Sequence, residues 1–331
     1  MFVFQLADEF NLDPGEGGAA KTSTAIEDDD EEDDELSFGD VRLELITAAD
    51  ALHVTDKIKK KKNLKTLNLS NKTIGFESAN EIGKALERHP ELERLIANGV
   101  SFGKREEVKE VLKSLVNGIM TAKAHLVDLE FSDQAIGVHD VEGLADLLKS
   151  PSCFSLKELR LNNTGCRKFA GILLAETLIE SFNNSGQKLA LKVVDIGRSA
   201  LQNEGAIELA KFFKMMGSLE EIVMHSNSIW SEGKVALVEA FSNNPNLRIV
   251  DLNDNWNSSE ETRPMALALA KALPNWPHLT AQPWVFTFQD RRRSADCRRA
   301  QVRAHQAGRA LPRRQRDWLR GGQIDHRGRD Q

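Results

Sequence analysis

Leucines separated by polar residues recur along the middle of the chain. Each copy has the form Leu-x-x-Leu-x-Leu, followed by two or three polar residues and an apolar residue that often precedes Gly. In the copy LKTLNLSNKTIG, which starts at Leu64, Leu67 and Leu69 alternate with polar residues. A period of two is typical of a strand with one buried and one open face. The pattern therefore predicts a short strand in each copy.

The copies follow one another at intervals of 28 to 35 residues. They begin at Leu64, Leu92 (a degenerate copy), Leu126, Leu156, Leu191, Leu219 and Leu247, with the start of another at Leu279. Stretches between them, such as VEGLADLLK and EGKVALVEAF, place apolar residues three and four positions apart. That spacing predicts a helix after each strand.

One strand and one helix cannot bury a core by themselves, but stacked repeats share a continuous one. The pattern and its period indicate a leucine-rich repeat at the long end of its range or slightly beyond. We therefore predict an α/β fold, a leucine-rich-repeat solenoid or horseshoe. Its parallel β-sheet would line the concave face and its helices the convex face.

Composition divides the chain into three parts. Residues 1–40 include nine consecutive acidic residues and many small ones, which predicts an acidic disordered segment. Residues 41–280 form the predicted repeat domain, and residues 281–331 form an arginine-rich tail. Residues 1–280 carry a net charge of −14 and the tail carries +8. The repeats therefore favour a partner with basic patches over nucleic acid.

The tail differs from the rest of the chain in its basic residues. It has 13 arginines and no lysine, whereas residues 1–280 have nine arginines and 22 lysines. Codons for residues 314–318, when read one base out of frame, can encode Gly-Asn-Glu-Ile-Gly, which is typical of a repeat loop. The neighbouring stretches, read in the same shifted frame, can encode strand and helix patterns in the order that a repeat requires. We interpret residues 281–331 as out of frame and unstructured, which leaves the predicted solenoid truncated. The alternative, a nucleic-acid-binding arm, predicts steep salt dependence of binding.

A polar residue often follows the predicted strand at a fixed position. It is Asn227 and Asn255 in two repeats, where a side-chain amide can bond buried backbone groups of neighbouring turns. Elsewhere this ladder position holds Lys72, Gln134, Thr164 or Ser199, so the asparagine ladder is incomplete.

The alternation within each strand identifies the residues that point away from the core. This predicted concave surface is mildly acidic and suits a basic protein patch, although a merely solvated sheet face is the alternative. Its members are Asn68, Asp128, Glu130, Glu158, Arg160, Asn162, Asp195, Glu221, His225, Asp251 and Asn253.

Motifs of the common enzyme classes are absent from the sequence. There is no G-x-S-x-G, phosphate-binding loop or H-E-x-x-H. Cys153, Cys166 and Cys297 lack the spacing of metal ligands and are too few for a disulfide framework. The N-terminus makes a poor signal peptide, and no apolar run is long enough to span a membrane. We therefore expect no metal site and a soluble, intracellular protein.

Three segments resemble the Ran GTPase-activating protein family. They are the Gly-Arg-x-x-Leu-x-Asn-Glu-Gly-Ala run at residues 197–206, Leu-Asn-Asp-Asn at residues 252–255 and LRLNNTG from Leu159. The first repeat, LNLSNKTIGFESANEIGKAL, is also similar to that family. The resemblance covers about residues 41–279.

The resemblance implies that the chain is a GTPase activator for the small GTPase Ran, in nucleocytoplasmic transport and signal transduction. The family is thought to clamp the switch region so that Ran's own glutamine orients the attacking water, without an arginine finger of the usual kind. By position, the family's active-site Asn corresponds to Asn163, and its second Asn is Thr164 here. The family's Arg in F-T-G-R falls on Lys104, or on Arg105 after a slip of one residue.

Further expectations combine this resemblance with the predicted concave surface. The partner surface would comprise Thr164 and the concave-surface residues Asn162, Arg160, Glu158, Asp128, Glu130, Asp195, Glu221, His225 and Asp251. The chain would need no cofactor of its own, since GTP and Mg would belong to the GTPase. We expect a monomer in the cytoplasm, with the nuclear envelope as one site and a Ran-binding protein as a further partner. The alternative function is a non-catalytic binding module of the ribonuclease-inhibitor type.

Overall fold

The computed structural model describes residues 34–104, 106–255 and 262–279. All of them lie in one of the two compact units of the chain, Asp34–Gln331. The predictions made for the arginine-rich tail and for residues 1–33 concern residues that lie outside the described ranges.

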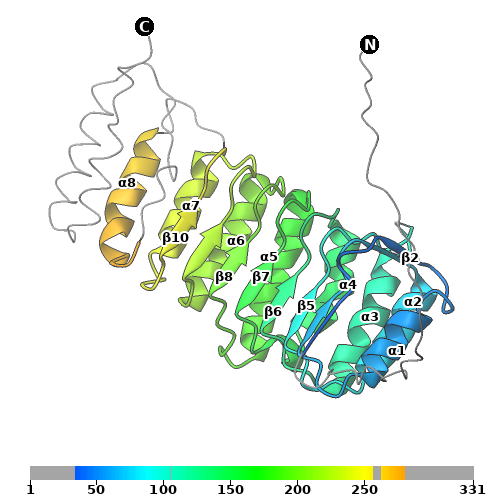
Figure 1. Cartoon of the computed structure of the whole chain (residues 1–331). Coiled ribbons are helices and arrows are strands. Elements are labelled where there is room, and N and C mark those ends of the chain that lie inside the picture. The colour runs from blue at the N-terminus through cyan, green and yellow to red at the C-terminus, as the bar shows by residue number, and fades with distance from the viewer. Residues whose placement is uncertain (1–33, 105, 256–261, 280–331) are drawn as a thin grey trace, which may run out of the picture. The chain divides into compact units, whose positions relative to one another are not determined.

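Strands and helices alternate along the described repeats (Figure 1). Eight strands form one parallel sheet in the order β1-β3-β5-β6-β7-β8-β9-β10. They are β1 (Glu35–Ser37), β3 (Thr66–Asn68), β5 (Arg94–Ile96), β6 (Asp128–Glu130), β7 (Glu158–Arg160), β8 (Val193–Asp195), β9 (Glu221–Val223) and β10 (Ile249–Asp251). A second, two-stranded parallel sheet pairs β2 (Leu43–Leu45) with β4 (Lys72–Ile74).

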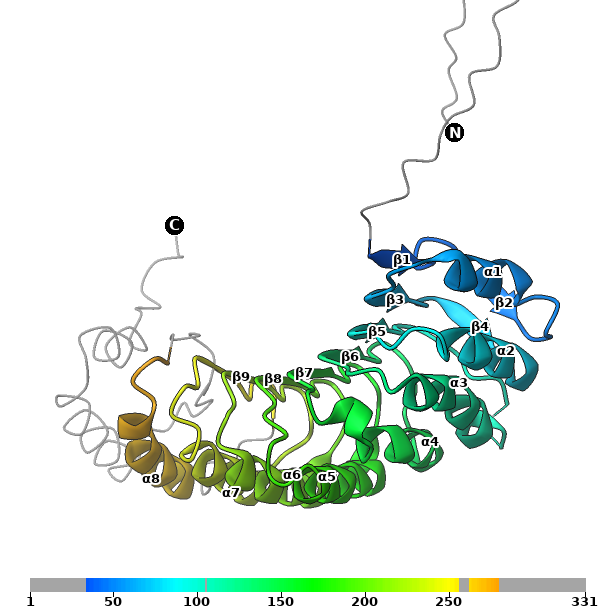
Figure 2. The ribbon, with the colours of Figure 1, turned by 90° about the horizontal axis from the view of Figure 1, so that it is seen from below.

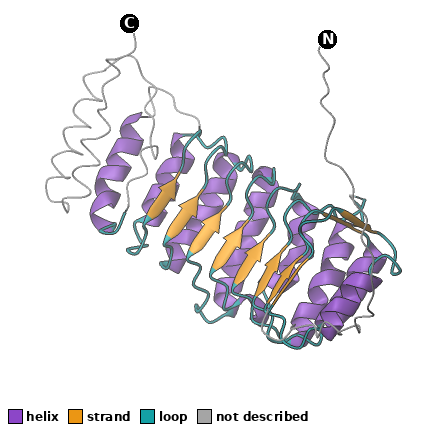
Figure 3. Cartoon of the chain, in the orientation of Figure 1, coloured by secondary structure: helices purple, strands orange, loops and turns teal. Residues whose placement is uncertain are grey.

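The helices form a layer on one side of the sheet (Figures 2 and 3). They are α1 (Leu52–Lys60), α2 (Phe76–Leu86), α3 (Val108–Ala122), α4 (Val138–Leu148), α5 (Arg167–Asn184), α6 (Gln202–Met216), α7 (Ser231–Phe241) and α8 (Thr262–Ala272), with short 3-10 helices at Pro151–Cys153 and Leu273–Asn275. The strands line the concave side of the repeats and the helices the convex side. The predicted leucine-rich-repeat solenoid is therefore confirmed.

The middle residue of each strand in the eight-stranded sheet points into the core. Strand register aligns these residues in one continuous row, and from β3 onward each is at most 2% exposed. The row consists of Leu36, Leu67, Leu95, Leu129, Leu159, Val194, Ile222 and Val250. Burying one such side chain stabilises a fold by about 1.5–3 kcal/mol, so the row joins the repeats into one core.

The strand predicted in each copy from Leu64 to Leu247 is confirmed, and each begins two residues after the first leucine of its copy. The predicted boundary at residue 41 is too late, because β1 already pairs with β3 at residues 35–37. Leu36 and Phe38 are apolar residues of a short, acidic copy of the pattern, and the surrounding charges conceal them in the sequence. The copy that would begin at Leu279 continues outside the described residues.

Ladder side chains bond buried backbone groups between repeats, as predicted. The Nδ2 of Asn227 donates to the carbonyls of Ile196 (2.7 Å) and Met224 (3.0 Å). Its Oδ1 accepts from the backbone N–H groups of Ser199 (3.0 Å) and Leu201 (3.3 Å). The amide thus serves four backbone groups that water does not reach.

Asn255 repeats this arrangement one repeat later. Its Oδ1 accepts from the N–H groups of Asn227 (2.9 Å) and Ile229 (3.0 Å), and its Nδ2 donates to Met224 and Leu252. In other repeats, residues other than asparagine form hydrogen bonds at the ladder position. The Thr164 and Ser199 hydroxyls bond each other at 2.9 Å, and Val100 N–H donates to the Gln134 Oε1 at 3.0 Å.

Lys72 occupies the ladder position at the N-terminal end and is only 1% exposed. Its ammonium donates to the carbonyls of Phe38, Val41 and Ser70. Burial lowers the pKa of Lys72 below its usual range, and Asp40 opposes that shift. Three carbonyl acceptors replace the water that the ammonium loses, and they tie the segment after β1 to the next repeat.

The ladder predicts a specific cost for losing one amide. Asn227→Ala leaves buried backbone groups without partners, and each such group costs about 1–3 kcal/mol. We expect the free energy of unfolding to fall by roughly 2–4 kcal/mol in urea denaturation, because local relaxation recovers part of the loss. Asn253→Ala is the matched control, since Asn253 Oδ1 is buried without a bond among the described residues. Equal destabilisation by both changes would contradict the ladder's role.

Candidate functional site

A row of residues with left-handed backbone conformation follows the strands along one rim of the sheet. Each lies three residues after the end of its strand, directly before the ladder position. Their φ values run from 53° to 62°. We call them the rim row: Asn71, Gly99, Asp133, Asn163, Arg198, Ser226 and Asp254.

Backbone hydrogen bonds connect the rim row from repeat to repeat. The N–H of Asp133 donates to Asn162 O, that of Asn163 to Gly197 O, and that of Arg198 to His225 O, each at 2.8 Å. Asn163 is therefore held between Asp133 and Arg198. Asn, Asp and Gly tolerate positive φ better than other residues, so the fold itself accounts for part of this row's composition.

The side chain of Asn163 is exposed at the rim. Its Nδ2 donates to the Asp133 Oδ1 at 2.9 Å, which fixes the orientation of the amide. Among the residues that the structure describes, no donor bonds to its Oδ1. An oriented amide can donate and accept hydrogen bonds, but it does not titrate near neutral pH and is not a nucleophile.

Lys104 lies in the loop between β5 and α3, and its side chain is exposed. Gly103 before it has φ 66°, and the buried Phe102 anchors the loop by stacking on Phe131 with ring centroids 6.1 Å apart. Because β5 and β7 are parallel, the loop that carries Lys104 leaves the sheet at the same end as the loop that carries Asn163. Arg105, the alternative position for the family's arginine, lies outside the described residues.

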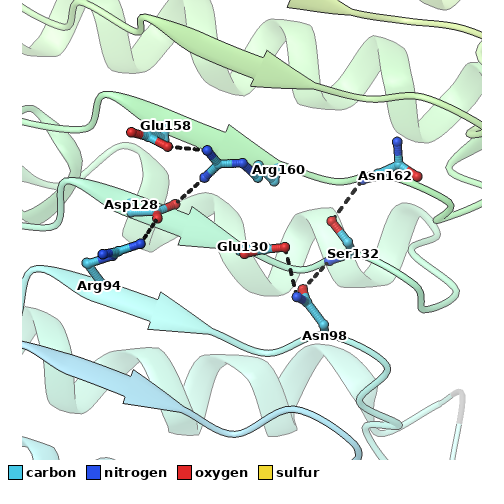
Figure 4. A network of polar contacts seen from close by, with 8 residues as sticks. All are labelled: Arg94, Asn98, Asp128, Glu130, Ser132, Glu158, Arg160 and Asn162. Carbon is cyan, nitrogen blue, oxygen red and sulfur yellow. Dashed lines mark hydrogen bonds and ion pairs between the residues drawn. The ribbon is translucent and has the colours of Figure 1, made fainter. Parts of the chain in front are cut away.

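Charged side chains on the middle strands of the concave surface bind one another (Figure 4). Asp128 on β6 lies between two guanidinium groups, with Arg94 and Arg160 each 3.1 Å from one of its oxygens. Arg160 also pairs with Glu158. The Asn98 amide donates to Glu130 at 2.8 Å and accepts from Ser132 N–H at 2.9 Å.

Two predicted contact residues do not lie where a partner can reach them freely. Thr164 is 2% exposed, and its hydroxyl bonds Leu161 O and the Ser199 hydroxyl, so it belongs to the ladder. Asp128 is 3% exposed beneath its arginines. The strand alternation that pointed Asp128 outward was right, but sequence alone could not show that two long side chains cover it.

The other predicted contact residues lie on the concave surface and are half-buried. They are Glu130, Glu158, Arg160, Asn162, Asp195, Glu221, His225 and Asp251. Asn162 bonds Asp195 at 2.8 Å, and Asp195 also accepts from Gly197 N–H at 3.0 Å. A Cβ at Gly197 would lie 2.7 Å from Asn162 Nδ2 and 2.8 Å from His225 Nε2, so a larger residue there would displace these two side-chain ends.

Arg198 is a neighbour of Asn163 that was not predicted as a site residue. It is exposed, it has φ 54°, and its backbone is bonded to the next repeat. The sequence did contain a signal, because an arginine stands where other repeats have Asn, Asp, Gly or Ser.

Other reactive groups do not add to this site. Burial raises the pKa of the Cys153 and Cys166 thiols to about 12, so both stay protonated at neutral pH. Among the described residues there is no cluster of three or more potential metal ligands. No described helix is long and apolar enough to cross a membrane.

The fold and the rim place the chain among leucine-rich-repeat proteins. No protein-family model matches it. It is 39% identical over 218 residues to a Ran GTPase-activating protein of Drosophila melanogaster and 42% identical over 199 residues to Ran GTPase-activating protein 1 of Xenopus laevis. The predicted resemblance to the Ran GTPase-activating proteins is therefore confirmed.

These matches cover 65% and 59% of the chain. They span only 37% and 34% of the two relatives, so the chain corresponds to about a third of each. A ribonuclease inhibitor of Sus scrofa is more distant, at 23% identity over 212 residues, which are 62% of the chain and 42% of that protein.

The buried carboxylate of Asp128 generates a prediction about pH. Burial raises the pKa of Asp128 above its usual value of 3.8, Glu158 adds to the rise, and Arg160 and Arg94 oppose it. Carboxyl NMR titration should therefore give a raised pKa, and Arg160→Gln should raise it further. Arg248→Gln, whose arginine pairs with Glu220, should leave it unchanged.

The same shift affects stability in one direction. Because the folded state favours protonated Asp128, the contribution of this group to the free energy of unfolding is present below pH 3.8 and is lost as the pH rises through its folded-state pKa. A wild-type pKa below 3.8 would show that the arginines outweigh burial, and a pKa that falls in Arg160→Gln would show that Arg160 does not lower it as described.

Proposed function

We propose that the chain stimulates GTP hydrolysis by the small GTPase Ran. The observation that carries this proposal is the oriented amide of Asn163 at an exposed rim, in a chain similar to two Ran GTPase-activating proteins. The similar segment includes the strand and turn that present Asn163. The GTPase would bring GTP and Mg, and this chain would add no cofactor.

The mechanism follows from what the rim residues can do. Asn163 neither abstracts a proton nor forms a covalent intermediate, so its contribution is to position a group of the partner. We propose that it clamps the switch region and thereby holds Ran's own glutamine against the attacking water. A preorganised donor at such a point acts on the transition state more than on binding.

The cation of the loop before α3 has a separate role in the proposal. Lys104 or Arg105 would approach the partner beside Asn163, and only arginine offers a planar fork of donors. Comparing Lys104→Gln with Arg105→Gln in the hydrolysis assay distinguishes the two positions. The residue whose loss lowers the stimulated rate more is the one that fills the role.

Cellular expectations accompany this function. The chain would act as a monomer in the cytoplasm, with the nuclear envelope as one location and a Ran-binding protein as an additional partner. A ribonuclease-inhibitor-like binding module is the second candidate function, supported by the distant match to that protein. It predicts a stable complex without faster hydrolysis.

The decisive experiment removes the Asn163 side chain without straining the backbone. Because Asn163 has φ 55°, Asn163→Gly suits the native conformation better than Asn163→Ala. We expect the rate of Ran GTP hydrolysis at saturating chain to fall roughly 10²-fold, with little change in the half-saturating concentration.

Asp254→Gly is the matched control, because Asp254 is exposed and occupies the equivalent rim-row position with φ 53°. It should retain the wild-type rate within about twofold. Full stimulation by Asn163→Gly would remove Asn163 from the mechanism. Tight binding by the wild-type chain with no stimulation would instead support the binding module.

A further inference from the structure

The concave surface has two halves with different chemistry. On β5, β6 and β7 the outward charges are paired internally, because Arg94 and Arg160 bind Asp128 and Arg160 binds Glu158. A partner that approached these strands would have to separate existing ion pairs. This half is therefore a poor place for a charged partner to gain affinity.

On β8, β9 and β10 the outward positions alternate between aliphatic side chains and carboxylates. Strand register aligns Val193, Glu221 and Ile249 in one row and Asp195, Val223 and Asp251 in the next. All six are half-buried. We call these six residues the mixed face.

The carboxylates of the mixed face have no cationic partner among the residues that the structure describes. Asp195 accepts from the Asn162 amide and Gly197 N–H, and Asp251 accepts from Asn253 N–H. The nearby Lys192 and Arg248 instead pair with Glu220, which lies just before β9. Three negative charges thus remain next to three partly exposed aliphatic groups.

One kind of side chain satisfies both features of the mixed face. Lysine and arginine have an apolar stem that can cover a valine or isoleucine and a charged head that can reach a neighbouring carboxylate. Neighbouring strands are about 4.8 Å apart, so stem and head of one residue span adjacent positions. The face therefore complements a surface that carries several lysines or arginines.

We propose that the mixed face docks a lysine- or arginine-bearing patch of the partner GTPase. The proposal rests on the proposed function for the identity of that partner. It assigns binding to β8–β10 and leaves the effect on hydrolysis to the rim around Asn163. Charge complementarity of this kind contributes mainly to encounter and to the stability of the complex.

The test uses the full chain with the three charges removed, Asp195→Asn, Glu221→Gln and Asp251→Asn. The matched control is Glu176→Gln, Glu232→Gln and Glu239→Gln, three exposed helix residues whose loss changes the net charge equally. We expect the sheet variant to raise the half-saturating concentration of Ran·GTP roughly tenfold and to weaken its salt dependence. The hydrolysis rate at saturation with the sheet variant should stay within about twofold of wild type. The helix variant should match wild type in both the half-saturating concentration and the rate at saturation.

A second variant guards against loss of folding. Val223→Lys places a cation among the carboxylates and should weaken binding in the same way, provided that circular dichroism and the urea midpoint match wild type. The proposal would be overturned if the half-saturating concentration were unchanged in both the sheet variant and Val223→Lys while both fold. It would also be overturned if the helix variant lost as much affinity as the sheet variant.

Failure of the proposed function gives a different result. If the wild-type chain does not stimulate Ran, a soluble lysine–leucine helical peptide serves as the probe. Binding that the sheet variant loses and the helix variant keeps would retain the mixed face as a docking surface for basic proteins. Binding that both variants keep, or both lose, would overturn it.

Discussion

The need to bond backbone groups buried between successive turns governs this molecule. A three-residue strand followed by a tight turn leaves N–H and C=O groups inside the repeat, where water does not replace a missing partner. Asn227 and Asn255 supply both a donor and an acceptor to those groups, and Ser199, Thr164, Gln134 and Lys72 meet the same need with other chemistry. Once the ladder is in place, strand register follows, and register decides which side chains share the concave surface.

The outward-facing charges of the sheet differ between its middle strands and its C-terminal strands. Its middle strands use their charges on one another, while β8–β10 leave carboxylates beside aliphatic groups. The rim follows from the turn itself, since each turn requires one residue with positive φ before the ladder position. Asn163 is therefore both a residue that the turn accepts and an amide that Asp133 orients toward the outside.

Periodicity was sufficient to predict the strands from Leu64 to Leu247, the parallel sheet and the ladder positions, because each rests on spacing alone. It missed β1, whose Leu36 and Phe38 lie among acidic residues, and the pair of β2 and β4. Alternation also gave the direction of Asp128 correctly but not its burial, which depends on the conformations of Arg94 and Arg160. Thr164 was assigned both to the ladder and to the partner surface. Only the packing between repeats, which buries its side chain, excludes Thr164 from the partner surface.

The rim row also bears on how such a protein can change over evolutionary time. Its backbone is held on both sides by bonds that involve no side chain, as at Asn163 and Arg198. Exchanges among Asn, Asp, Gly and Ser at these positions therefore alter the chemistry offered to a partner at little cost to the fold, whereas β-branched residues are disfavoured by positive φ. Substitutions in the rim row can therefore change partner specificity one repeat at a time, while the buried ladder beside it is left unchanged.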